Sequence, residues 1–74
     1  MTHERITSDP KIMMGKPVIK GTRITVELLL RLLSKKHGIA EILDGYPSLK
    51  EDDIYAAQAY AADYLASERI LAAE

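Results

Sequence analysis

The sequence predicts a single, mainly α domain in which three helices of the helix-turn-helix type follow a short β arm or hairpin. The first 25 residues carry two of the three prolines and two of the four glycines and show no helical period. The rest divides into two amphipathic segments with a very short one between them. A chain of 74 residues without cysteine folds marginally alone and has no disulfides to staple it. We therefore expect residues 1–74 to form one domain that self-associates or binds a partner.

The extended β arm over residues 1–25 contains the stretch GKPVIKGTRIT. Its β-forming residues flank Gly21, and glycine at the first central position of a two-residue loop is typical of a type II′ hairpin. We expect residues 18–25 to form a small hairpin of this type, with Lys20 and Arg23 held side by side at its tip.

The first helix is expected over residues 26–37. Thr25 suits the N-cap, and Gly38 has the position of a helix stop. The apolar stripe with the period of a helix consists of Val26, Leu29, Leu30 and Leu33. Leu28 and Leu32 lie outside this stripe, so the apolar arc is wider than one core face needs.

A short second helix is expected over residues 40–44, and a third over 50–66, with 67–74 as a C-terminal extension. Ser48 and Glu51 have the S-x-x-E spacing of a capping box at the start of the third helix. The predicted core stripe of this helix is Ile54, Ala57, Ala61, Tyr64 and Leu65.

The net charge of −1 conceals a strong polarity along the chain. Residues 1–37 hold eight Lys or Arg and three Asp or Glu, whereas residues 38–74 hold two and eight. Such a division favours two contact surfaces of opposite sign, and the alternative is a chance bias on a solvated surface.

DNA contact, if it is a function of this chain, is expected from the basic half. The third helix is a poor reader of base edges, because it opens with Glu51-Asp52-Asp53 and offers only Gln58. Phosphate contacts would come from Lys16, Lys20, Thr22, Arg23, Arg31 and Lys35. The alternative is that the cations at the hairpin tip are only solvated.

Catalysis is not predicted. The two glycines of GKPVIKGTR lack P-loop spacing, the acids of Glu51-Asp52-Asp53 do not converge on a helix, and His37 has no Ser or Cys partner. We expect a non-enzyme with no catalytic residue, metal or cofactor. No apolar run is long enough to span a membrane, and the first ten residues are too polar for a signal peptide, so a cytoplasmic protein is expected.

Apolar side chains beyond the needs of one small core indicate protein contact. We expect at least a dimer or a complex with a partner, bound through Leu28, Leu32, Tyr60, Tyr64 and Leu71.

Several motifs resemble the prokaryotic family known as domain of unknown function 433. They are RITSDP, GKPVIKGTRITV, EIL and YPSLKEDDIYAA, and together they run from Arg5 to about Leu65. The resemblance implies a homeodomain-like helical fold after a short β arm. It also implies an antitoxin that neutralises a PIN-like ribonuclease toxin and can bind operator DNA. Lys50 and Ala40 depart from the family pattern, which usually has hydroxyl-bearing helix caps at these positions.

An alternative function is a homodimeric protein-interaction module without nucleic-acid binding. A small PIN-like nuclease in the neighbouring reading frame would favour the antitoxin.

Overall fold

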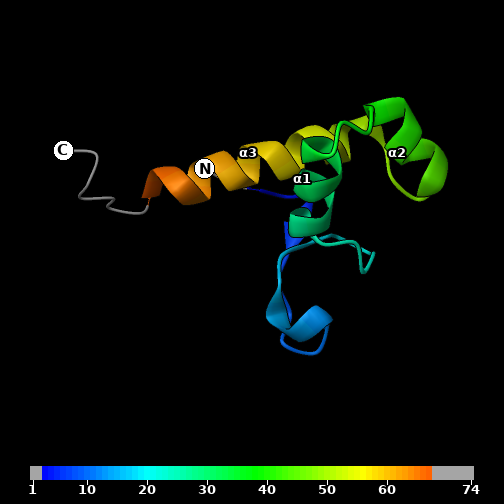
Figure 1. Ribbon diagram of the computed structural model, residues 1–74. Helices are drawn as coiled ribbons and strands as arrows, with labels where there is room; N and C mark the ends of the chain where they lie inside the picture. Colours follow the sequence, from blue (N-terminus) through cyan, green and yellow to red (C-terminus); the bar gives the residue numbers. More distant parts are fainter. Residues whose placement is uncertain (1–2, 68–74) are drawn as a thin grey trace.

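The computed structural model describes residues 3–67 and confirms a mainly helical domain with a short two-stranded arm. The elements are β1 (Ile6–Thr7), a 3₁₀ turn η1 (Met13–Gly15), β2 (Val18–Ile19), α1 (Val26–Ser34), α2 (Ile39–Gly45) and α3 (Glu51–Ser67). The short α1 lies across the long α3, α2 lies beside the beginning of α3, and the β arm leaves the start of α1 (Figure 1). No helix within residues 3–67 combines the length and the apolar character needed to cross a bilayer.

The two strands of the arm come from its two ends. β1 pairs antiparallel with β2, with Ile6 opposite Ile19 and Thr7 opposite Val18. Val18 also forms an isolated bridge with Thr25, which brings the chain back to the start of α1.

The prediction of a two-residue hairpin loop is wrong. The backbone NH of Ile19 donates to the carbonyl of Ile24 at 2.9 Å, so four residues, 20–23, form the loop. Gly21 has the predicted positive φ, at 81°, but it is the third residue of a turn closed by the NH of Thr22 and the carbonyl of Ile19. Positive φ at this position is the signature of a type II turn, which leaves Lys20 and Arg23 without the cross-strand pairing that we expected.

α1 begins as predicted. The side-chain oxygen of Thr25 accepts a hydrogen bond from the NH of Leu28 at 2.9 Å, so Thr25 is the N-cap.

The end of α1 comes earlier than predicted, and Gly38 is not its stop. Lys36 takes the left-handed conformation with φ 71°, and its NH bonds the carbonyl of Leu33. The NH of His37 bonds the carbonyl of Leu32, which completes a Schellman motif. Gly38 is instead the extended N-cap of α2.

α3 begins with a different cap from the predicted one. The residue before Glu51 is Lys50, whose side chain has no acceptor, so Asp53 supplies the cap in the reverse direction: its Oδ2 accepts from the NH of Lys50 at 2.9 Å. The other oxygen, Oδ1, lies 2.9 Å from Nη1 of Arg5. The Ser48–Glu51 capping box is therefore wrong, and the buried carboxylate of Asp53 also ties the residue before β1 to α3.

The core lies between β2, α1, α2 and the first half of α3. Its buried cluster consists of Ile19, Val26, Leu29, Ile42, Leu49, Ile54 and Ala57. Tyr64 and Leu65 are each 57% exposed, so the last two positions of the predicted core stripe are not in the core. The physical reason is length, because α1 has 9 residues and α3 has 17.

Candidate interaction site

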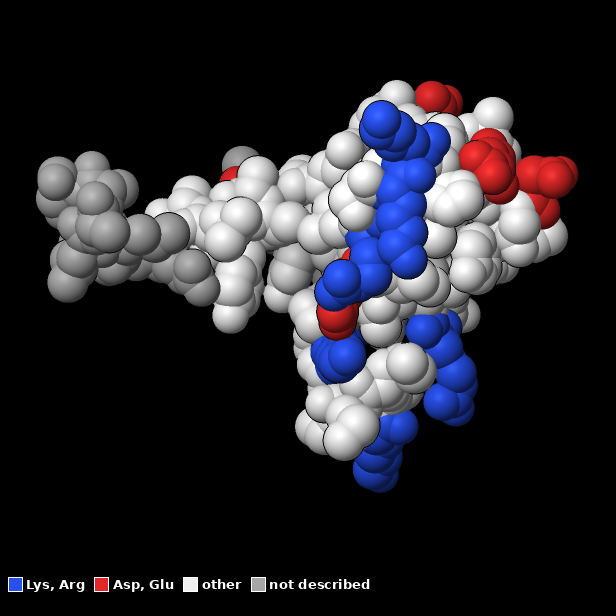
Figure 2. All heavy atoms as spheres, viewed as in Figure 1, with Lys and Arg blue, Asp and Glu red and all other residues white. Residues whose placement is uncertain are grey.

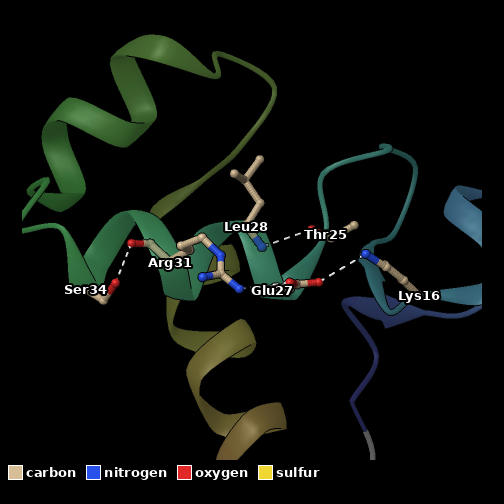
Figure 3. A network of polar contacts seen from close by, with 6 residues as sticks. All are labelled: Lys16, Thr25, Glu27, Leu28, Arg31 and Ser34. Carbon is tan, nitrogen blue, oxygen red and sulfur yellow. Dashed lines mark hydrogen bonds and ion pairs between the residues drawn. The ribbon is translucent and has the colours of Figure 1, made fainter.

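A column of cations follows α1 on one face of the molecule (Figure 2). We call Lys16, Arg31, Lys35 and Lys36 the basic column. Glu27 lies within it, with Oε1 at 3.2 Å from Nζ of Lys16 and Oε2 at 3.0 Å from Nη2 of Arg31 (Figure 3). Hydrogen bonds from Arg31 and then Lys16 lower the pKa of the Glu27 carboxyl below 4.5. One of the two positive charges at this end of the column is therefore compensated within the chain.

The two cations of the loop, Lys20 and Arg23, are both exposed. Lys20 lines a shallow hollow with Arg5 and Lys50, and Arg23 lines a second hollow with Thr7 and Ile12. The two hollows share Thr22 and Ser48.

Thr22, expected to contact DNA, has its hydroxyl engaged within the loop. The hydroxyl donates to the carbonyl of Ile19 at 2.8 Å, and its oxygen accepts from the NH of Ile24 at 3.0 Å. Of the six residues predicted to contact DNA, Lys16 and Arg31 meet at Glu27, Lys35 lies one helical turn after Arg31 at the end of α1, and Thr22 has a turn-forming role.

An apolar groove of about 540 Å³ lies between the beginning of α1 and the end of α3. Its apolar walls are made by Pro17, Val26, Leu30, Tyr60, Tyr64 and Leu65. Glu27 and Arg31, from the basic column, also line it and form a polar rim. Most of its lining is carbon, as in sites that bind another protein or a small apolar ligand.

Two of the five predicted partner-binding residues meet in this groove. The rings of Tyr60 and Tyr64 stack with centroids 6.4 Å apart. Leu32 is not a free outer residue, because it packs against the core cluster. Leu28 is half-buried and points away from the ion-paired side of α1 (Figure 3). Leu71 lies outside the described residues.

The sequence did not predict that the N-terminal segment of the chain packs against the last turns of α3. His3 meets Tyr60 edge to face, with ring centroids 5.2 Å apart. Its Nε2 lies 3.0 Å from Oδ2 of Asp63, and this buried oxygen accepts no hydrogen bond among the described residues. No sequence signal connects positions 60 residues apart.

Acidic side chains gather over α2, away from the basic column (Figure 2). We call the exposed acids of α2 and the first turn of α3 the acidic surface: Glu41, Asp44, Glu51 and Asp52. The hydroxyl of Tyr55 donates to Glu51 at 3.3 Å, and the charge of Glu51 raises the pKa of Tyr55. Within residues 3–67 the acids and histidines form no group arranged to hold a metal ion.

The sequence profile described as "Protein of unknown function (DUF433)" matches residues 6–61. A protein of Sinorhizobium fredii named "Uncharacterized protein y4eO" is 36% identical over 58 residues, which cover 78% of this chain and 26% of that protein. An "Uncharacterized protein" of Archaeoglobus fulgidus is 59% identical over 29 residues, covering 39% of this chain and 81% of its own length.

A solved structure has the same fold. The crystal structure of a DUF433 member protein from Anabaena variabilis superposes with a TM-score of 0.77 at 30% identity. The alignment covers 80% of this chain and 58% of that one, so this chain spans only part of both the rhizobial and the cyanobacterial relatives. The profile match over most of the chain, supported by this shared fold, shows that the chain belongs to the DUF433 family.

Proposed function

We propose that this chain is a cytoplasmic, antitoxin-like protein that binds and neutralises a PIN-like ribonuclease toxin. The observation that carries the proposal is the separation of charge between the acidic surface and the basic column (Figure 2). A nuclease that binds RNA presents cations to the phosphates of its substrate. An exposed acidic surface on a small binding protein competes for those cations, and opposite charges speed the encounter of the two proteins.

The arrangement of the acidic surface supports this role. Its acids lie on α2 and the first turn of α3, and both elements are anchored in the core by Ile42 and Ile54. A rigid base limits the entropy lost when charged side chains meet a partner. Among the acids of this region, Asp53 is buried in its pair with Arg5, so the exposed acids, not Asp53, would make the contact.

The test is co-purification with the product of the neighbouring reading frame, which the proposal requires to be a PIN-like nuclease, together with an RNA-cleavage assay. We expect the wild-type chain to inhibit cleavage, and Asp44→Lys to weaken binding by about tenfold, as a lost and reversed contact charge does. Asp9→Lys makes the same charge change in the turn after β1 and is the control; circular dichroism must show that it stays folded, because the Asp9 carboxylate accepts the NH of Lys11 at 2.9 Å. Failure of the wild-type chain to bind or inhibit the nuclease contradicts the proposal, as does equal weakening by both variants.

The basic column favours operator DNA as a second ligand. Lys35 and Lys36 lie at the C-terminal end of α1, where their charges are exposed and available to phosphates. We expect DNA binding to fall steeply with salt, and Lys35→Ala with Lys36→Ala to reduce the slope of log K against log salt by about two. An unchanged slope would exclude the column as the DNA contact. Lys20→Ala with Arg23→Ala tests the loop cations in the same titration.

A further inference from the structure

The N-terminal segment of the chain contacts α3 at two places. Arg5 reaches the first half of the helix, where its Nη1 lies 2.9 Å from Oδ1 of Asp53. His3 reaches the second half, where its Nε2 lies 3.0 Å from Oδ2 of Asp63. We call residues 3–5, which carry both contacts and lead into β1, the strap. The dark blue segment that contains the strap runs from the β arm toward α3 (Figure 1).

The two contacts of the strap respond differently to pH. A guanidinium group stays charged throughout the neutral range, so the pair of Arg5 with Asp53 persists there. An imidazole in water loses its proton near about pH 6.5. The contact of His3 with Asp63 therefore joins opposite charges at mildly acidic pH and loses one of them as the pH rises.

The burial of one carboxylate oxygen makes the second contact depend on charge. Oδ2 of Asp63 is buried and accepts no hydrogen bond among the described residues. Such an oxygen is stabilised by a neighbouring positive charge, and without that charge it must find a hydrogen-bond donor. The Asp63 side chain as a whole is 40% exposed, so water reaches the oxygen once His3 moves away.

The other ionisable groups around His3 do not replace the missing charge. On α3, the ring of Tyr60 meets His3 edge to face with centroids 5.2 Å apart, and a neutral phenol supplies no charge. Within the strap, Glu4 is exposed and Arg5 is engaged with Asp53. Carboxylates and guanidinium groups keep their charges between about pH 5.5 and 8, so the imidazole is the group in this set that changes.

We propose that the strap is a pH-sensitive device. Its outer end is docked on the second half of α3 while His3 is protonated and is released when His3 is neutral, and the pair of Arg5 with Asp53 holds the inner end in both states. Release frees one side of Tyr60, which stacks on Tyr64 in the wall of the apolar groove. The strap and its two carboxylates are separate from the acidic surface and the basic column, so the device does not rest on the proposed function.

The experiment measures nuclear Overhauser effects between the ring protons of His3 and Tyr60 in the full chain. We expect a clear signal at about pH 5.5 and the loss of most of it at about pH 8, because the protonated fraction of an imidazole falls steeply between these values. His37→Gln is the matched control. It removes the other histidine of the chain, whose Nδ1 lies 3.0 Å from Glu41 on α2, and is expected to leave the response unchanged.

A second variant tests the role of the carboxylate. Asp63→Asn keeps the shape of the side chain and removes its charge, so we expect a weak signal at both pH values and no comparable change between them. Asp52→Asn neutralises an exposed acid in the first turn of α3 and should retain the wild-type response. Circular dichroism at both pH values would confirm that each variant is folded.

Two results would overturn the proposal. The first is a wild-type signal of the same intensity at both pH values, whether strong or absent. The second is a loss of signal with rising pH that Asp63→Asn retains in full, because the response would then not depend on the carboxylate that faces His3. Neither result bears on the test of nuclease binding.

Discussion

The two halves of α3 have the same helical pattern but different surroundings. In residues 51–57, Ile54 and Ala57 are fully buried against α1 and α2. In residues 60–67, the positions that continue the stripe, Tyr64 and Leu65, are mostly exposed. The difference shows that a periodic apolar stripe predicts which face of a helix seeks a partner, but not whether the same chain supplies that partner.

The charges of the two halves differ in the same way. In the first half of α3, Asp53 is buried, and its carboxylate accepts hydrogen bonds from Arg5 and from a backbone NH. Beside the end of α3, Glu27 of α1 pairs with Arg31 and Lys16, and all three side chains are more than half exposed. The buried contact at the beginning of α3 should therefore contribute to the free energy of unfolding. The exposed contact at the rim of the groove should contribute little to it and remains available for binding.

The largest expected difference in stability is between two variants that each truncate an apolar side chain, one in each half of α3. Ile54→Ala should lower the free energy of unfolding by about 3 kcal/mol, because it leaves a cavity in the core. Leu65→Ala should lower it by less than about 0.5 kcal/mol, because the side chain of Leu65 is mostly exposed to water. Urea unfolding at low concentration measures both values, and equal losses would show that the two halves are buried alike.

A smaller effect is expected from the two acids that face Arg5. Asp53→Ala should cost about 2 kcal/mol, because it removes the helix cap and leaves Arg5 and the NH of Lys50 without their carboxylate. Asp52→Ala is the matched control: its side chain is 74% exposed and its oxygen lies 3.6 Å from Arg5. A loss below about 0.5 kcal/mol is expected for the control. If the two variants unfold at the same urea concentration, the carboxylate of Asp53 does not stabilise the first half of α3.

Features set by near neighbours in the sequence could be predicted. The N-cap at Thr25, the positive φ of Gly21 and the buried stripe positions Val26 and Leu29 all follow from contacts within a few residues or from the helical period. The end of α1 could not, because a lysine, Lys36, takes the left-handed conformation that a glycine usually occupies.

The candidate site was predicted only in part, because it joins distant segments. Tyr60 and Tyr64 stand out as apolar residues in excess of the core, but the groove also needs Pro17 and Leu30, which only the packing of α1 on α3 brings beside them. The contact of Arg5 with Asp53 spans 48 positions. Such pairs depend on the relative placement of elements, for which a single sequence contains no period or motif.

The smallest effect is expected at Glu27, on the polar rim of the groove. Arg31 and Lys16 lower its pKa in the folded chain, so the ionised carboxylate contributes stability above its unfolded pKa near 4.5, and this contribution is lost as the pH falls through the folded value. Arg31→Ala should raise the pKa of Glu27 toward 4.5, which an NMR titration of its carboxyl carbon measures. The stability difference between wild type and Glu27→Gln should be small at neutral pH and vanish in acid, since the pair is solvated. If Glu27→Gln lost as much stability as Asp53→Ala, the ion pairs at the rim of the groove would contribute as much to folding as the buried pair. The polar contacts beside the two halves of α3 would then not differ as we expect.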